Sequence, residues 1–288
     1  MSAASSIEKQ PRQFESNLSV NPDFTLAQPL EAYTAADHAV WRQLFERQSA
    51  LLQGRACTPF LEGLAALQIR PDRVPVFAEL NQQLAAASGW EIVAVPGLVP
   101  DQVFFEHLAQ RRFPVTWWMR RADQLDYLQE PDCFHDVFGH VPLLINPVFA
   151  DFMQRYGRLA AAASPEDLTL LARLYWYAVE FGLIRDKVDD SLRIFGAGIV
   201  SSKSESLYSL ESPAPNRLGF DLERVMRTNY RIDTFQKTYF VIDSFDAIIQ
   251  AVDVDMPALL AKLRELPTFD AGHVMHSDRL IHRGIQRD

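Results

Sequence analysis

The spacing of apolar residues predicts a chain built mostly from helices. Between Ala35 and Leu52, apolar side chains recur at the intervals of one helical face. Similar patterns predict helices over 58–67, 76–86, 100–109, 165–181 and 255–266. Ser164 and Pro165 suit the start of one of these helices, because serine caps a helix and proline fits its first turn. Gly89 and Gly182 stand where glycine often ends a helix.

Only a few short runs have the composition of strands. Residues 91–95, 113–119 and 239–242 are rich in β-branched and aromatic side chains. These runs do not alternate regularly with the helices, so a doubly wound parallel sheet is not expected. We therefore expect one mostly α-helical α+β domain over residues 23–270. A polar segment, 1–22, is predicted to be disordered, and residues 271–288 are predicted to form a tail.

The composition narrows the class of protein. Of the 288 residues, 48% are hydrophobic and 23% are charged, as in ordinary globular proteins. The formal net charge of −9 argues against a nucleic acid partner, because an acidic surface repels phosphates. No apolar run is long enough to span a membrane, and residues 1–20 show no signal pattern, so we expect a cytoplasmic location. Cys57 and Cys133 are predicted to be reduced, partly buried thiols.

Two histidines form the first candidate metal pair. His135 and His140 lie five residues apart between Pro131 and Pro142. On a straight α-helix, residues five apart point about 140° away from each other. We expect Gly139 to end a short helix, so that the chain turns and both imidazoles converge on one metal ion.

Glu180 is the candidate third ligand. It lies near the end of the helix predicted over 165–181, among aromatic and aliphatic residues. A carboxylate is disfavoured at that end of a helix, and a buried carboxylate needs a partner. Two histidines and one carboxylate suit a non-haem Fe(II) oxygenase. A zinc hydrolase with the same ligands and a metal-stabilised binding protein both remain open.

Two further segments carry weaker signals. His273, His276 and Asp278 could suggest a metal site, but they have few apolar neighbours and are predicted to lie in a solvated tail. Gly196 and Gly198 superficially match a dinucleotide-binding motif. The third glycine of that motif is missing, so no such site is expected.

Three motifs, in order along the chain, resemble those of the pterin-dependent aromatic amino acid hydroxylases. They are Glu130-Pro-Asp-x-x-His-Asp-x-x-Gly-His-Val-Pro-Leu, Tyr175-Trp-x-x-Val-Glu-Phe-Gly-Leu and Gly196-Ala-Gly-x-x-Ser-Ser. The resemblance extends over roughly residues 23–245 and is strongest to bacterial members that act on phenylalanine. It implies the catalytic fold of that family and hydroxylation of L-phenylalanine to L-tyrosine. Tryptophan and tyrosine remain alternative substrates within the family.

The resemblance also assigns residues to each ligand. It implies Fe(II) bound by His135, His140 and Glu180, with a tetrahydrobiopterin-type co-substrate and O2. The pterin site that it implies consists of Gly97, Leu98, Val99, Phe104, Asp136 and Tyr175. Phe104 would stack on the pterin ring. The shorter Asp136 stands where some relatives have glutamate, and it would hold the pterin through water.

A substrate site is implied in the same way. Arg120 would bind the carboxylate of the amino acid through its planar guanidinium fork. The aromatic pocket would be walled by Trp176, Phe181, Gly198 and Ser201. Glu205 would orient a ligand from behind the site. Because only about 22 polar residues precede the core and no tetramerisation helix follows it, we expect a monomer.

Overall fold

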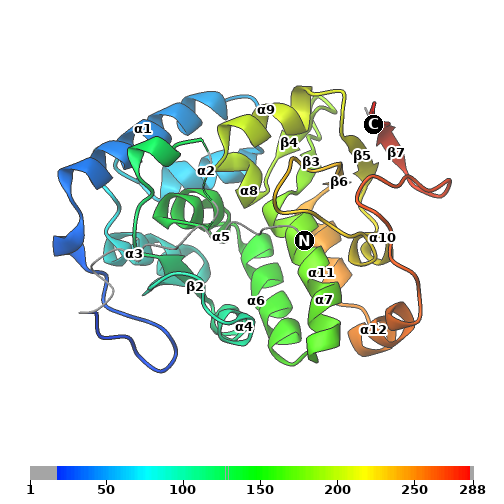
Figure 1. Cartoon of the computed structure of the whole chain (residues 1–288), viewed down its shortest axis with the longest axis horizontal. Helices are drawn as coiled ribbons and strands as arrows, with labels where there is room; N and C mark the ends of the chain where they lie inside the picture. Colours follow the sequence, from blue (N-terminus) through cyan, green and yellow to red (C-terminus); the bar gives the residue numbers. More distant parts are fainter. Residues whose placement is uncertain (1–17, 127, 129, 286–288) are drawn as a thin grey trace, which may run out of the picture.

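The computed structural model describes residues 18–126, 128 and 130–285 (Figure 1). Its α-helices are α1 (Ala35–Leu51), α2 (Thr58–Ala66), α3 (Phe77–Ser88), α4 (Asp101–Ala109), α5 (Val141–Leu144), α6 (Pro147–Ala161), α7 (Pro165–Leu174), α8 (Ala197–Val200), α9 (Lys203–Glu211), α10 (Leu222–Met226), α11 (Phe245–Val252) and α12 (Met256–Arg264). Short 3-10 turns are η2 (Leu30–Ala32) and η3 (Ala122–Gln124), and two π-helical turns are η4 (His135–His140) and η5 (Tyr175–Glu180). The strands are β1 (Glu91–Val95), β2 (Arg112–Thr116), β3 (Leu183–Arg185), β4 (Leu192–Ile194), β5 (Asn216–Gly219), β6 (Thr238–Ile242) and β7 (Leu280–His282).

The predicted fold class, α+β and mostly helical, is confirmed. The predicted helices correspond to α1, α2, α3, α4, α7 with η5, and α12, and the predicted strands to β1, β2 and β6. Several elements were not predicted, among them the long helix α6. Residues 1–17 of the segment expected to be disordered lie outside the described residues. From residue 18 on the chain is described, and the Asn21 N–H donates to the Thr25 carbonyl.

A small parallel sheet supports one side of the molecule. β1 and β2 pair in parallel from Glu91 with Arg112 to Val95 with Thr116, and α4 connects them. α4 packs closely against α6, since a Cβ on Gly157 would lie 2.5 Å from the Leu108 Cβ. This contact fixes α4 and the side chains on its inner face.

A mixed five-stranded sheet, in the order β4-β3-β6-β5-β7, forms the other side. Its central strand β6 is buried along its whole length and pairs in parallel with β3 and β5. α6 and α7 run side by side between the two sheets (Figure 1). The Tyr156 hydroxyl on α6 donates to the Leu171 carbonyl on α7. The core therefore fills the space between both sheets and these central helices.

The C-terminal residues fold onto this sheet. β7 pairs with β5, and Asp278 forms a buried ion pair with Arg224 at 2.9 Å. The prediction of a solvated tail is therefore wrong for Asp278, because Arg224 supplies a buried cation that Asp278 neutralises.

Two other expectations can be compared with the fold. Cys57 and Cys133 are both free, as predicted, and they are fully buried where partial burial was expected. Within the described residues, no helix combines the length and the apolar character needed to cross a membrane.

Candidate active site

The two histidines lie on a π-helical turn, and the prediction of a helix break at Gly139 is wrong. The chain winds through η4 and continues directly into α5, of which Pro142 is the second residue. A π turn closes hydrogen bonds between residues five apart, so positions i and i+5 share a face. His135 and His140 therefore converge because of the winding of the helix.

Gly139 has a different role from the one predicted. A Cβ at this position would lie 3.0 Å from the Ala197 carbonyl oxygen and 3.2 Å from the Ala197 Cβ. Only glycine allows α8 to approach η4 so closely without displacement. The Gly139 position therefore serves packing between two site-forming segments.

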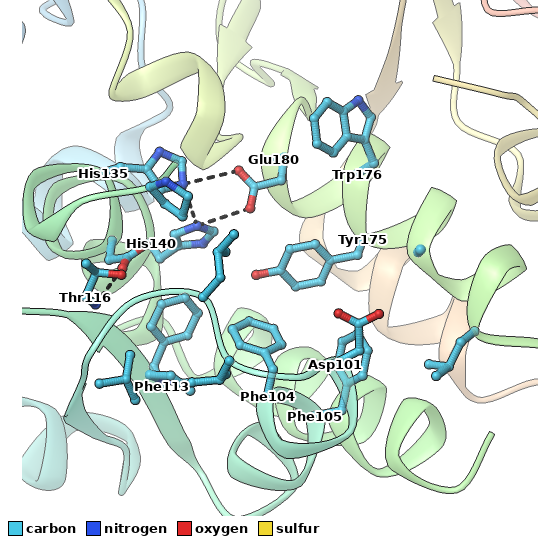
Figure 2. Close-up of a pocket in the computed structure, with 18 of the residues that line it drawn as sticks. Asp101, Phe104, Phe105, Phe113, Thr116, His135, His140, Tyr175, Trp176 and Glu180 are labelled. Atoms are coloured by element: carbon cyan, nitrogen blue, oxygen red, sulfur yellow. Dashed lines mark hydrogen bonds and ion pairs between the residues drawn. The ribbon is translucent and has the colours of Figure 1, made fainter. Parts of the chain in front are cut away.

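Glu180 ends a second π turn. The helix predicted over 165–181 is continuous, but it changes at Tyr175 from the α-helix α7 to η5. The Phe181 N–H donates to the Trp176 carbonyl, which is the hydrogen bond between residues five apart. Tyr175 and Glu180 are also five apart, and both point toward the cavity (Figure 2).

Three donor groups meet between these turns. The Nε2 atoms of His135 and His140 lie 3.3 Å apart. Glu180 places one carboxylate oxygen 3.2 Å from Nε2 of His140 and the other 3.7 Å from Nε2 of His135 (Figure 2). The side chains of His140 and Glu180 are only 5% and 14% exposed.

Hydrogen bonding assigns the proton on His135. The Ser201 hydroxyl lies 2.7 Å from the Ala197 carbonyl and donates its single proton there. It must then accept from Nδ1 of His135, which lies 2.9 Å away. Burial lowers the pKa of His135 to about 4, so the imidazole is neutral at pH 7. The Nε2 lone pair therefore faces Glu180 and His140, ready for a metal ion.

Glu180 is held in its ionised form. Burial alone would raise its pKa, but the neighbouring His140 and His135 and the backbone N–H of Gly198 lower the pKa below the ordinary value. Gly198 also approaches closely, since a Cβ there would lie 2.9 Å from the Phe181 ring and 3.2 Å from the Glu180 carbonyl. α8 thus supports both π turns.

This donor set fits a metal ion. Ligand atoms about 2.0–2.2 Å from an ion lie roughly 3 Å from one another when their bonds meet at right angles. Asp136 is also within reach of the two histidines, but one of its oxygens accepts the Thr116 N–H at 2.7 Å. Glu180 places an oxygen within 3.7 Å of each Nε2 atom, so its carboxylate is the candidate third ligand.

A cavity of about 780 Å³ opens beside the three donors. Its walls include all three candidate metal ligands and the whole predicted pterin set, namely Gly97, Leu98, Val99, Phe104, Asp136 and Tyr175. The Phe104 ring makes edge contacts with Phe113 at 5.9 Å and Tyr175 at 5.8 Å. Figure 2 shows this aromatic wall beneath the histidines. A flat heteroaromatic ring fits such a wall.

Asp136 lies at the end of the cavity nearest β2. Burial raises the pKa of its carboxyl to about 7, although the Thr116 N–H opposes this shift. One carboxyl oxygen of Asp136 thus accepts the Thr116 N–H, and the residue also lines the cavity.

Arg120 does not line the cavity. Its Nε and one terminal nitrogen donate to the two oxygens of Asp132 at 2.9 and 2.8 Å, and the other nitrogen donates to the Leu125 carbonyl at 3.4 Å. The side chains of Arg120 and Asp132 are 8% and 0% exposed. These bonds use three of the five N–H groups of a guanidinium, which leaves donors for an incoming carboxylate.

The residues predicted for the substrate wall divide into two groups. Trp176 lines the cavity. Phe181 stands behind it with ring centroids 4.7 Å apart, while Gly198 and Ser201 support Glu180 and His135. Glu205 bonds to the Tyr239 hydroxyl and to the Gln236 backbone, and none of the hydrogen bonds among described residues joins it to a candidate metal ligand.

Two functional residues were missed from the sequence. Asp132 accepts the backbone N–H of His135 at 3.0 Å as well as the Arg120 fork. Its position three residues before His135 is the spacing of a helix cap, a signal that could have found it. Gln236, which bonds to Trp176, lies 60 residues away in sequence and gives no local signal.

Comparisons with known proteins agree with this geometry. The family profile described as biopterin-dependent aromatic amino acid hydroxylase matches residues 6–257. The chain belongs to this family. It is 62% identical to the phenylalanine-4-hydroxylase of Ralstonia nicotianae, over 97% of this chain and 90% of that protein.

Solved structures extend the comparison. The phenylalanine hydroxylase of Chromobacterium violaceum with bound iron(III) and 7,8-dihydrobiopterin is 60% identical, with a TM-score of 0.86 over 90% of this chain and 94% of that one. The same enzyme with iron and phenylalanine bound is 57% identical, with a TM-score of 0.87 over 92% and 97% of the two chains. The family and the cofactors of these neighbours fit the donor set and the aromatic cavity described above.

Proposed function

We propose that this protein is a phenylalanine 4-monooxygenase that uses Fe(II), a tetrahydropterin and O2 to convert L-phenylalanine to L-tyrosine. The observation that carries this proposal is the convergence of two imidazoles and one carboxylate at the edge of an open aromatic cavity. The phenylalanine-4-hydroxylases at 60–62% identity support the choice of substrate.

His135, His140 and Glu180 would hold the iron. When bound, the iron and the reduced pterin supply the activation of O2, of which one atom is transferred to the substrate ring. Ser201 keeps the His135 lone pair turned to the iron, and Gly198 does the same for the Glu180 carboxylate. The Phe113 ring, 4.7 Å from His140, keeps water from that side of the ligand.

Phe104 and Tyr175 would border the pterin, with Gly97, Leu98 and Val99 as the backbone edge and Asp136 at its inner end. Arg120 would receive the carboxylate of the amino acid with the donors that Asp132 leaves available. Trp176 would form the wall for the benzyl side chain, with Phe181 behind it. A monomeric state and a cytoplasmic location also belong to the proposal, and sedimentation of the purified protein and cell fractionation would test them.

The decisive assay combines the protein with Fe(II), a tetrahydropterin and L-phenylalanine. Tyrosine should form in step with O2 uptake, and omission of any of the three should stop it. A zinc-loaded protein should be inactive. If the protein consumed O2 but formed no tyrosine from phenylalanine, the proposed function would be wrong.

Removing the third ligand should stop both binding and turnover. Glu180→Ala is expected to lose iron during gel filtration and to form no detectable tyrosine, because two imidazoles alone leave the ion weakly held. Glu166→Ala is the matched control, since Glu166 is an exposed acid at the start of the same helical run. Full iron retention by Glu180→Ala would assign the third ligand to another residue, with Asp136 as the next candidate.

A further inference from the structure

Stacking fixes the plane of the Trp176 ring. Its centroid lies 4.4 Å from that of Tyr230 at an interplanar angle of 14°, and 4.7 Å from that of Phe181 at 33°. Offset stacking favours a plane and a spacing, but it resists rotation within the plane only weakly. A directional contact is needed to fix which edge of the indole faces the cavity.

Gln236 supplies that contact. The Trp176 indole N–H donates to Oε1 of Gln236 at 3.0 Å. The amide Nε2 of Gln236 in turn donates to the Arg231 carbonyl at 3.0 Å. Because the nitrogen is committed as a donor, the amide cannot be reversed without losing both bonds. Gln236 is 4% exposed, so water does not replace these bonds readily.

The sheet holds Gln236 in turn. Its backbone N–H donates to Glu205, and the same carboxyl group accepts from the Tyr239 hydroxyl on β6. Gln236 lies two residues before the start of β6, directly after the exposed stretch 231–235. The position of Trp176 at the cavity is therefore set from the buried central strand of the larger sheet.

We propose that Gln236 is a positioning residue that fixes the Trp176 wall and thereby the fit of the aromatic side chain of the substrate. The inference rests on the proposed function, because it assigns Trp176 to the amino acid pocket. Without the bond, the indole rotates in its plane against the Tyr230 and Phe181 rings. The pocket then binds phenylalanine less well and discriminates less against the larger side chain of tryptophan.

A double-mutant cycle tests the inference. Gln236→Met keeps the approximate length of the side chain and removes the acceptor, whereas Trp176→Phe keeps an aromatic ring and removes the donor. Each single variant should raise the KM for phenylalanine about tenfold, the change expected from one buried hydrogen bond. The double variant should show no larger increase than the greater of the two single variants. Calorimetric titration of the iron-loaded protein with phenylalanine, without pterin, should show the same pattern in Kd.

Gln154→Met is the matched control. Gln154 also accepts one side-chain bond, from Arg111, and donates one to a backbone carbonyl, that of Ala109, but it lies outside the cavity lining. Its KM should equal that of the wild type. The ratio of kcat/KM for phenylalanine to that for tryptophan should fall in Gln236→Met and remain constant in Gln154→Met.

Two results would overturn the inference. An unchanged KM and Kd in folded Gln236→Met would show that the bond does not position the wall. Additive effects in the double variant would show that Gln236 acts independently of Trp176. Should Gln236→Met misfold, Gln236→Leu removes the same acceptor with a shorter apolar side chain. An unchanged KM in that folded variant counts equally against the inference. A wild-type protein that neither binds nor hydroxylates phenylalanine would instead contradict the proposed function.

Discussion

The two π-helical turns solve the same geometric problem with different supports. η4 brings together His135 and His140, and η5 brings together Tyr175 and Glu180, in both cases across five residues. Behind η4 lies Asp132, whose pKa is lowered: burial opposes ionisation, but the bonds from Arg120 and from the His135 backbone prevail. η5 has no ion pair of this kind behind it among the described residues.

η5 is supported by aromatic contacts and by a hydrogen-bonded carboxyl group. Trp176 stacks on Tyr230 and contacts the tilted ring of Phe181. Its indole N–H donates to Gln236, whose backbone N–H donates to Glu205. Burial raises the pKa of Glu205 to about 7, since the Tyr239 and Gln236 bonds only partly offset the loss of water. One turn is thus fixed by a permanent charge pair and the other by a carboxyl group that titrates near neutrality.

The largest effect is expected from removing the charge behind η4. Asp132→Ala leaves Arg120 buried without its partner and removes the cap from the His135 N–H. Breaking a buried ion pair from one side costs about 3–5 kcal/mol of the free energy of unfolding. Urea unfolding monitored by circular dichroism measures this loss. Asp123→Ala, which breaks the exposed ion pair with Arg121, should leave the midpoint unchanged. If Asp132→Ala and Asp123→Ala unfolded at the same urea concentration, the buried ion pair would contribute no more to stability than the exposed one.

An intermediate effect is expected from pH at the acid behind η5. A folded-state pKa of about 7, raised from the ordinary 4.5, means that Glu205 adds stability that is fully present below about pH 4.5 and is lost as the pH rises through 7. The loss amounts to at most about 3 kcal/mol. Glu205→Gln has no carboxyl group at this position and therefore no such loss. The wild type should lose stability relative to this variant between pH 5 and pH 8.

Urea unfolding of both proteins at the two pH values supplies that measurement. The lowered pKa of Asp132 gives no such change in this range, because its contribution is lost only below its ordinary value of 3.8. A difference between wild type and Glu205→Gln that does not vary with pH would show that Glu205 is ionised throughout.

The smallest effect is expected at the hydroxyl that orients a ligand on η4. Ser201→Ala removes the acceptor for Nδ1 of His135, and lost support of this kind weakens metal binding about 10- to 100-fold. Competition with a chelator for Fe(II) measures the change. Ser209→Ala removes a buried hydroxyl on α9 that donates to the Ser206 carbonyl, and it should leave the affinity unaltered. If wild type and Ser201→Ala bound Fe(II) with the same affinity, the hydrogen bond to Ser201 would not be needed to orient His135.

Much of this arrangement was predictable, but the winding of the ligand-bearing turns was not. The apolar pattern located the helices around Leu44 and Leu84, and the apolar setting of Glu180 indicated a need for a cation. A π turn differs from an α turn by one residue, and that difference lies within the scatter of any periodicity. Gly139 therefore looked like a helix stop, whereas its lack of a side chain serves contact with α8.

The supports behind the site were also beyond sequence reasoning. Ser201 meets His135 across 66 residues, and Gln236 meets Trp176 across 60. Such partners are set by how the sheets and helices pack, which no local pattern encodes. The family resemblance named Ser201 as part of the substrate wall, and the hydrogen bond shows what its hydroxyl touches. Arg120 was recognised, but not Asp132, which accepts two of its hydrogen bonds.

The position of α8 has a consequence for how the chain is made. His135 and His140 leave the ribosome well before Ala197 and Ser201, which hold them in place. At roughly 5–20 residues per second, the interval of about 60 residues lasts several seconds. During that time a nascent chain carries two histidines that are not yet held at the geometry of the finished site. Iron acquisition should therefore follow synthesis of α8, so that a ribosome-bound chain ending before Gly196 should not retain the metal.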